Sequence, residues 1–452
     1  MTVTAAPPYL AVNPGGKREA KRRFVVRAVF FIFLLSLIEG PLRKWFLPGL
    51  AGPLTLLRDP FVIALYAYCL VNGMMRTRGI AGVWLMFAFF TSAIGLFQYL
   101  AAGLPAWGWM LGVRTYWLYM PLAFVVAKTF RREDIDLFLK LCLWIAIPYA
   151  FLVAAQYSAP PNAFLNLGVG ADEEGAVGVA DGILRPFGLF TYTGPNVQFT
   201  AFMIAVFVAF YVGNVPMRRR GLFLLASGAA VGSMSVLTGS RSIYFLAAMI
   251  VGLTLAGMFA AHPTWTSLRR ALGILGFTLL AAALFVLVFP DMLDAMASRF
   301  ERAAQSEGSI WNRALSGLVR WVDPLFTAPV FGMGIGAGAP GVARMLGLPT
   351  LLYGESDLQR NVNELGLLMG TVMLVLRFGL AAWLVWTAYH LARKGEPIAL
   401  PLAGFAFFPF LMGQITHSPL NAFLVWLAAG YIFALALNPR RSKRRTDAVF
   451  PA

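Results

Sequence analysis

The hydrophobic and polar positions along the chain alternate between long apolar stretches and short polar ones. Apolar stretches of about 20 residues recur throughout, and each is long enough to cross a bilayer core of about 30 Å. A transmembrane barrel would instead show strands of about ten residues with alternating polarity. The pattern therefore predicts an all-α polytopic membrane protein with about twelve transmembrane helices. The expected spans are residues 24–40, 54–73, 79–101, 113–128, 136–157, 196–213, 221–238, 242–260, 270–289, 363–391, 398–414 and 418–437.

Basic residues cluster at the ends of the expected spans, in every second loop. The chain has 37 Lys and Arg against 20 Asp and Glu, and its formal net charge is +17. Their placement is the positive-inside pattern of helical membrane proteins, so we attribute the excess to topology and anionic lipid rather than to nucleic-acid binding. Both termini are then cytoplasmic. The clusters are Lys17–Arg23, Arg76–Arg78, Lys128–Arg132, Arg218–Arg220, Arg269–Arg270, Arg393–Lys394 and Arg440–Arg445.

The longest polar interruptions predict two large loops on the outer, periplasmic side, at residues 158–195 and 290–362. In the second loop, residues 309–322 have apolar positions at helical spacing with arginines on another face, which indicates a short amphipathic helix. The expected organisation is a cytoplasmic tail at 1–23, nine spans at 24–289, the large loop at 290–362, three spans at 363–437 and a basic tail at 438–452.

A polar island at residues 355–364 follows a glycine-rich turn and leads into the tenth span. Carboxylates, amides and an arginine beside a hydrophobic helix are a functional hypothesis by default. Glu355 and Asp357 are the candidate catalytic residues, because a carboxylate at a dry interface can have a raised pKa and accept a proton. Glu355 could equally form a structural ion pair with Arg360, about one helical turn further on.

Several arginines on the expected outer side depart from the positive-inside trend: Arg185, Arg241, Arg313 and Arg360. A guanidinium offers a planar fork of donors that matches phosphate oxygens, so these residues are candidates for binding a lipid-linked pyrophosphate. Each could instead cap a helix, extend to lipid phosphate or pair with a loop carboxylate. His417 is the only histidine on the outer side in this topology, and it is a further candidate for substrate binding.

Arg377 lies in the middle of the tenth expected span. A charged side chain at that depth needs a partner or a watery cavity. We expect Arg377 to serve the packing of its span against another helix, and Glu39 and Asp59 are candidate partners.

Three short patterns follow one another in the second half of the chain. The first is the turn TGSR ending at Arg241, the second is Arg313 followed by a Gly-x-Gly-x-Gly run from Gly332, and the third is NELGL from Asn363, which opens the tenth span. RPFGLFTYTGPN, which begins at Arg185, is a weaker fourth. In order and spacing these patterns resemble the O-antigen polymerase and O-antigen ligase superfamily of bacterial membrane enzymes.

The resemblance implies a GT-C-like fold and a glycosyltransferase of the bacterial inner membrane, with its active site on the periplasmic face. The donor would be an oligosaccharide linked to undecaprenyl pyrophosphate, which the enzyme would polymerise into O-antigen or exopolysaccharide. Glu355 would orient or deprotonate the acceptor hydroxyl, and the arginines would stabilise the departing pyrophosphate. A chain-length regulator and a flippase are the implied protein partners.

One departure from the superfamily favours a polymerase over a ligase. The ligases have a His-Asn pair shortly before the glutamate that opens this helix, where the present chain has Glu355 and Ser356. Transfer of the glycan to another acceptor by a ligase is the alternative. A transporter is the alternative of another class, because carriers often share this layout, but no convincing internal repeat is found.

The sequence also bears on metals and other cofactors. It contains no His/Cys cluster with metal-ligand spacing. Arginines can neutralise a departing pyrophosphate in place of a metal ion, so we expect metal-independent chemistry and no cofactor.

Overall fold

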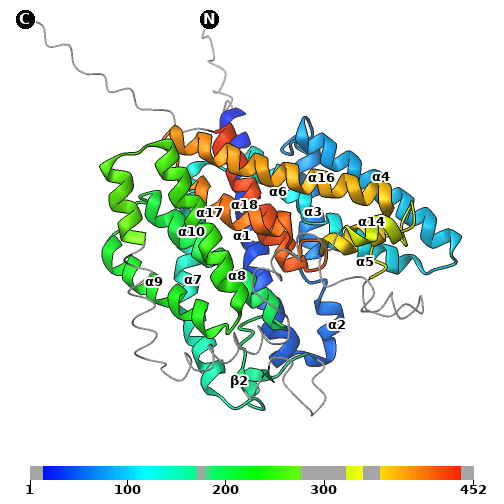
Figure 1. Ribbon diagram of the computed structural model, residues 1–452, viewed down its shortest axis with the longest axis horizontal. Coiled ribbons are helices and arrows are strands. Elements are labelled where there is room, and N and C mark those ends of the chain that lie inside the picture. Colours follow the sequence, from blue (N-terminus) through cyan, green and yellow to red (C-terminus); the bar gives the residue numbers. More distant parts are fainter. Residues whose placement is uncertain are drawn as a thin grey trace, which may run out of the picture.

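The computed structural model describes residues 14–169, 179–180, 183–274, 276, 322–338 and 357–438, which are almost entirely helical (Figure 1). Within these residues, nine helical stretches are long and apolar enough to cross a membrane. The chain is therefore an α-helical polytopic membrane protein, as the apolar pattern predicts. The stretches contain α1 (Pro14–Pro41) with η1 (Leu42–Phe46); η2 (Pro48–Leu50) and α2 (Ala51–Leu54) with α3 (Asp59–Val71); α4 (Ile80–Ala101); α7 (Arg132–Ser158); α8 (Thr193–Val212); α9 (Arg220–Leu237); α10 (Arg241–Ala261); α16 (Asp357–Arg393); and α18 (Pro419–Leu437).

The total of twelve spans stays a prediction. α5 (Ala106–Trp117) and α6 (Met120–Thr129) meet at a bend of 41° and would together make a tenth span. α17 (Ala399–Leu411) is apolar but only 13 residues long, and the expected span 270–289 lies mostly outside the described residues. Smaller described elements are η3 (Phe164–Asn166), the antiparallel strands β1 (Val179–Ala180) and β2 (Ile183–Leu184), and α14 (Asp323–Thr327).

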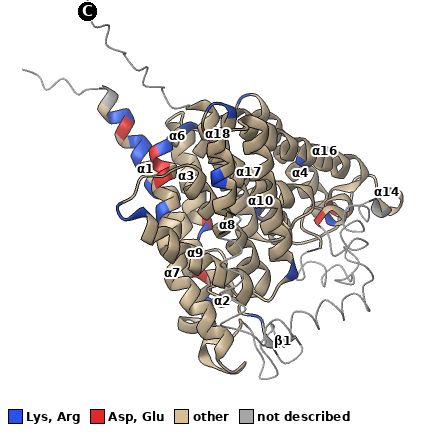
Figure 2. Ribbon diagram, turned by 60° about the vertical axis from the view of Figure 1, so that its left-hand side comes forward, with Lys and Arg blue, Asp and Glu red and all other residues tan. Residues whose placement is uncertain are grey.

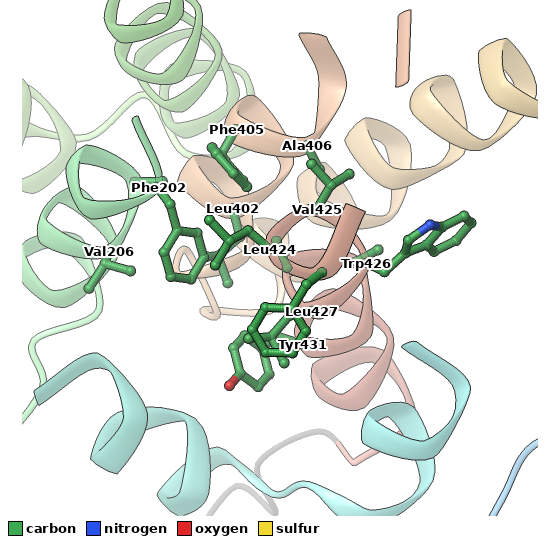
Figure 3. Close-up of a cluster of buried hydrophobic side chains, with 14 of the residues drawn as sticks. Phe202, Val206, Leu402, Phe405, Ala406, Leu424, Val425, Trp426, Leu427 and Tyr431 are labelled. Carbon is green, nitrogen blue, oxygen red and sulfur yellow. The ribbon is translucent and has the colours of Figure 1, made fainter. Parts of the chain in front are cut away.

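Helices α8 and α18 form the centre of the bundle, and 89% of the apolar stretch of each is buried. Figure 3 shows their side chains meeting those of α17; the rings of Phe202 and Phe405 are 5.2 Å apart. α6 packs closely on α18 at Gly430, where a Cβ atom would lie 2.9 Å from the Cβ of Val126. Small residues allow such close helix crossings in membranes.

The two ends of the bundle differ in charge (Figure 2). Where α1 begins and α18 ends, Arg22 pairs with Asp134 and donates to the carbonyl of Thr129 (3.0 Å), and Asn438 donates to the carbonyl of Phe130 (3.1 Å). The described basic clusters of alternate loops gather at this end, as the positive-inside pattern predicts. We call it the terminal end (residues 16–22, 72–78, 128–134, 213–220, 393–396 and 438) and the opposite one the distal end.

Helix α16 reverses direction at Gly366 instead of running straight. The backbone of Gly366 has φ 83° and ψ 174°, which lies outside the helical region. Arg377 Nη1 lies 2.9 Å from Asp357 Oδ2 across 20 residues, whereas a straight helix of that length would separate them by about 30 Å. Residues 357–365 therefore fold back, antiparallel, along residues 367–377.

This reversal corrects the expected start of the tenth span. The sequence pattern has Asn363 open one continuous helix, but Asn363 and Glu364 lie on the folded-back segment, and the span follows Gly366. The two segments pack closely because Gly370 has no side chain: a Cβ atom there would lie 2.7 Å from the Cα of Val362.

Residues 329–338, which we call the glycine turn, provide hydrogen bonds to the backbone groups at the reversal. Met333 N donates to the carbonyl of Asn363 (3.0 Å), and Leu367 N donates to the carbonyl of Pro329 (3.1 Å). Because non-helical backbone at membrane depth must find its hydrogen bonds within the protein, the reversal and the glycine turn depend on each other.

Substituting alanine for Gly366 should destabilise the protein by about 3 kcal/mol or more. The positive φ disfavours any side chain, and the new Cβ would lie 2.2 Å from the backbone nitrogen of Gly332. The matched control is Gly379→Ala on the same helix, where a Cβ meets no atom within 4 Å and alanine should stabilise by up to about 1 kcal/mol. Thermal unfolding in detergent, followed by tryptophan fluorescence, checks both. Equal midpoints for the two variants would contradict the reversal.

Candidate functional site

Polar side chains from three elements meet at the distal end. They come from the folded-back segment of α16, from the span that follows it, and from residues 412–418 between α17 and α18. All but His417 are buried. A buried polar group is tolerated only when it is hydrogen-bonded, so the partners of each one define what it can do. We call this group the distal cluster: Asp357, Arg360, Asn361, Glu364, Arg377, Thr416 and His417.

Glu364 ties the folded-back segment to the glycine turn. Its Oε2 accepts a hydrogen bond from Gly336 N (2.9 Å), and its Oε1 accepts from Gly338 N (2.8 Å) and from Arg360 Nε (2.9 Å). Hydrogen bonds to a carboxylate are stronger than those between neutral groups. Glu364 therefore fixes the position and orientation of the Arg360 guanidinium.

The glycine turn is also held from its other side, by α4 and α5. Gln98 Nε2 donates to the carbonyl of Phe331 (2.7 Å), and Tyr99 donates to the carbonyl of Ile335 (3.1 Å). At Gly112 of α5, a Cβ atom would lie 2.2 Å from the Ile335 carbonyl oxygen. The turn is thus fixed between α4, α5 and α16, and the donors that it directs at Glu364 are preorganised.

Arg360 Nη1 donates to Nδ1 of His417. An imidazole nitrogen that accepts a hydrogen bond carries no proton, so the proton of neutral His417 is on Nε2. Burial lowers the pKa of His417 from its ordinary 6.5, and the positive charge of Arg360 lowers it further. His417 is therefore a neutral donor through Nε2, and its basic nitrogen is occupied. This suits the substrate-binding role predicted for it.

Asp357 accepts hydrogen bonds at both carboxylate oxygens. Its Oδ2 accepts from Arg377 Nη1 (2.9 Å), Ile415 N (3.0 Å) and Thr416 N (3.1 Å), and its Oδ1 accepts from the Thr416 hydroxyl (2.8 Å). The side chain is fully buried. These contacts favour a structural role, joining the reversal to the α17–α18 loop, over the catalytic role predicted from the sequence.

Arg377 finds its partner inside its own helix, which corrects the expectation for this residue. Besides Asp357, it donates to the carbonyls of Pro409 (2.8 Å) and Phe410 (3.1 Å) at the end of α17. The two partners expected from the sequence pair elsewhere, Glu39 with Arg43 and Arg58, and Asp59 with Arg114. The packing role expected for Arg377 is retained, with Asp357 in their place.

A second group of cations at the distal end was not singled out in the sequence: Arg43, Lys44, Arg58 and Arg114. Arg58 is buried and lies 2.7 Å from Glu39, and its Nη1 has no hydrogen-bond partner in the described part of the chain. The sequence offered a signal for two of them, because Arg43 and Lys44 lie in the first outer loop of the predicted topology and depart from the positive-inside trend.

Tyr192 links this group to the distal cluster. It precedes α8, and burial raises its pKa, while a hydrogen bond with Ser418 and the charge of Arg43 lower it. Ser418 follows His417 directly, so the loop between α17 and α18 lies between the two sets of cations. Most of the cations in the two sets are paired with one of four carboxylates, so the two sets together carry only a small excess of positive charge.

Four predicted site residues are not members of the distal cluster as defined above: Arg185, Arg241, Glu355 and Arg313. Arg185 precedes α8, is half-buried, and its Nε has no hydrogen-bond partner among the described residues. Arg241 is half-buried at the start of α10, also at the distal end. Glu355 and Arg313 lie outside the described residues, as does the expected amphipathic helix at 309–322 apart from its last residue. Of the seven predicted site residues, the described structure brings together Asp357, Arg360 and His417.

In the described ranges, no group of three or more His, Cys, Asp or Glu side chains is placed to hold a metal ion. Metal independence stays a prediction.

Acidification should weaken the distal cluster through His417. Its pKa is lowered in the folded protein, so the stability that this group contributes is present above its ordinary pKa of 6.5 and is lost as the pH falls through the folded-state value. Protonation would place a proton and a positive charge against Arg360. We expect the thermal midpoint of the wild type to fall, as the pH is lowered below the ordinary pKa of 6.5, more than that of His417→Asn, whose amide oxygen still accepts from Arg360. Identical pH profiles would exclude this role.

The comparisons with known proteins leave the function open. No protein-family model matches the chain, and the search of curated proteins found no match.

Proposed function

We propose that this protein is an inner-membrane glycosyltransferase that polymerises oligosaccharide repeat units carried on undecaprenyl pyrophosphate. The observation that carries the proposal is the pairing of Arg360 with His417, within a buried polar cluster at the end of the bundle opposite to the basic clusters. A permanently charged fork beside a neutral imidazole donor suits the oxygens of a pyrophosphate leaving group. The transfer of a sugar is proposed from the sequence patterns that resemble the O-antigen superfamily.

The positive-inside rule supports a periplasmic site. The terminal end carries the basic clusters, which cytoplasmic ends of membrane proteins favour. The distal cluster lies at the other end, where lipid-linked oligosaccharides are available after transfer across the membrane. In this orientation the cations of the distal end have no role in topology. Most of them form ion pairs with carboxylates, and the donors that these pairs leave over are available to a ligand.

In the proposed reaction, the oxygen of an acceptor hydroxyl attacks the anomeric carbon of the lipid-linked glycan. A glycosidic bond forms, the bond from that carbon to the pyrophosphate oxygen breaks, and the hydroxyl proton passes to a base. Glu355 stays the candidate for that base. Arg360 and the Nε2–H of His417 donate to phosphate oxygens as negative charge develops there.

The state of the cations supports a polyanionic ligand. Arg360 Nη2 donates to no other described residue, while Nε and Nη1 are held by Glu364 and His417. Arg58 and Arg185 each keep a donor without a hydrogen-bond partner among the described residues. The donors of Arg58 and Arg185 that lack a partner are buried, and such donors are unfavourable unless a ligand completes them.

A carrier is the second candidate, and the reversal of α16 favours it. Carriers often bind substrates where a helix is interrupted near the middle of the membrane. Here, however, both backbone ends of the interruption are bonded to the glycine turn, so few backbone groups are left to coordinate a substrate. We therefore rank the enzyme first.

The decisive experiment gives the purified protein, in lipid, the undecaprenyl-pyrophosphate oligosaccharide of its own organism. Products are resolved by gel and mass spectrometry for the wild type, Glu355→Gln and Arg241→Ala. A ladder of longer lipid-linked glycans, lost in both variants, would establish the polymerase. Transfer of the glycan to a different acceptor would establish a ligase. Saturable uptake into proteoliposomes without any turnover would favour the carrier.

A further inference from the structure

A basic pocket opens at the terminal end, away from the distal cluster. Its volume is about 620 Å³. The start of α1, the turn after α3, the junction of α6 and α7, and the end of α18 form its walls. Its lining includes one carboxylate, Glu19, and six cationic side chains: Lys17, Arg18, Lys21, Arg22, Lys128 and Arg131.

Part of the wall is fixed by contacts within the protein. Arg22 and Arg131 each pair with Glu19 at 3.0 Å, which engages the only carboxylate of the lining. Lys21 Nζ donates to Asn72 Oδ1 (2.7 Å), so α1 is also held to the turn after α3. These contacts preorganise the pocket before any ligand binds.

Three cations of the lining are left for a ligand. Lys17 and Arg18 lie on α1, and Lys128 lies at the end of α6 on a facing wall. All three are exposed, and none makes a hydrogen bond or ion pair with another described residue. An anion between the walls would contact both and neutralise part of their mutual repulsion.

The surface beside the pocket is apolar. The exposed fractions are 54% for Phe24, 57% for Leu70 and 87% for Val71, and each lies within two residues of a side chain that lines the pocket. In a membrane protein such side chains face acyl chains. The pocket therefore lies where the lipid-facing surface ends, at the depth of lipid headgroups. A soluble phosphate compound would make no use of these apolar side chains.

We propose that this pocket binds the phosphate headgroup of an anionic phospholipid. Lys17, Arg18 and Lys128 hold the phosphate, and the acyl chains lie on Phe24, Leu70 and Val71. The bound lipid joins α1 to the junction of α6 and α7. The proposal does not depend on the function proposed for the distal cluster.

Native mass spectrometry of the full-length protein in detergent tests this site, by counting bound phosphatidylglycerol, cardiolipin or phosphatidylcholine. Lys17→Gln/Lys128→Gln removes two cations from the pocket. Arg76→Gln/Arg78→Gln is the matched control, because it removes two exposed cations from the same end outside the pocket lining. We expect the first variant to bind the anionic lipids about 25-fold more weakly, a factor of about five for each cation, and the control to bind as the wild type does.

Several results would overturn the proposal. Equal losses in the pocket variant and the control would mean general attraction to a positive surface. Equal binding of phosphatidylcholine would exclude recognition of charge. Inorganic pyrophosphate that binds as tightly as the lipids would assign the pocket to a soluble phosphate compound. If the double variant cannot be purified, Lys128→Gln against Arg78→Gln makes the same comparison, with about a fivefold loss expected.

Discussion

Arg377→Met should lower the free energy of unfolding by about 3–5 kcal/mol, because it leaves a buried carboxylate without its cation. Arg377 and Asp357 are both fully buried at their side chains and lie 2.9 Å apart. The same substitution removes the donors that three backbone carbonyls at the end of α17 accept from the guanidinium. The melting midpoint in detergent measures the loss.

The double variant Asp357→Asn/Arg377→Met separates the ion pair from the packing of the side chains. Removing both charges eliminates the unpaired buried carboxylate, so at least half of the lost stability should return. Arg78→Met, at an exposed position of the terminal end, should change the midpoint by less than about 1 kcal/mol. If Arg377→Met were as stable as the wild type, the antiparallel arrangement of the two segments of α16 would be wrong.

The helices themselves could be predicted from the sequence because a membrane leaves the backbone little choice. An apolar stretch such as that of α8 or α18 must satisfy its own backbone groups, so length and hydropathy suffice to place it. The gathering of basic residues at one end was predictable for a similar reason, since it follows from alternation along the chain.

The reversal at Gly366 could not be predicted in this way. NELGLLMG has the hydropathy of a continuous span, and glycine is common inside membrane helices. The break is stabilised by hydrogen bonds to backbone groups of Pro329 and Met333. These two residues approach the break only in the folded protein, and the sequence around Gly366 does not indicate that they do. For the same reason the partner of Arg377 was missed: on a straight helix, Asp357 would be out of reach.

The sequence predicted several residues of the candidate site, but not the contacts that these residues make with one another. Asp357, Arg360, Asn361 and Glu364 of the polar island are buried, and Arg360 contacts His417. Roles within the site depend on which oxygen accepts from which donor. Glu364, which the sequence offers only as part of a motif, holds Arg360 and the glycine turn, while Asp357 makes structural contacts.

If the proposed function holds, Arg360→Lys should reduce turnover about 10²–10³-fold, nearly as much as Arg360→Ala. The guanidinium contacts Glu364 through Nε and His417 through Nη1, and a single ammonium cannot reproduce this fork although it keeps the charge. The reduction should fall mainly on kcat, because the positive charge that attracts the donor is retained while the donors aimed at the developing charge are lost.

The matched control for Arg360→Lys is Arg76→Lys, an exposed position at the terminal end, which should keep wild-type turnover. The assay is the conversion of lipid-linked oligosaccharide to longer products by purified protein in lipid, with melting midpoints recorded in parallel. A stable Arg360→Lys protein with wild-type kcat would show that charge alone suffices at this position. The pairing of Arg360 with His417 would then be structural, and the phosphate contacts would have to come from other cations of the distal end, among which Arg58 and Arg185 each keep a donor without a hydrogen-bond partner in the described ranges.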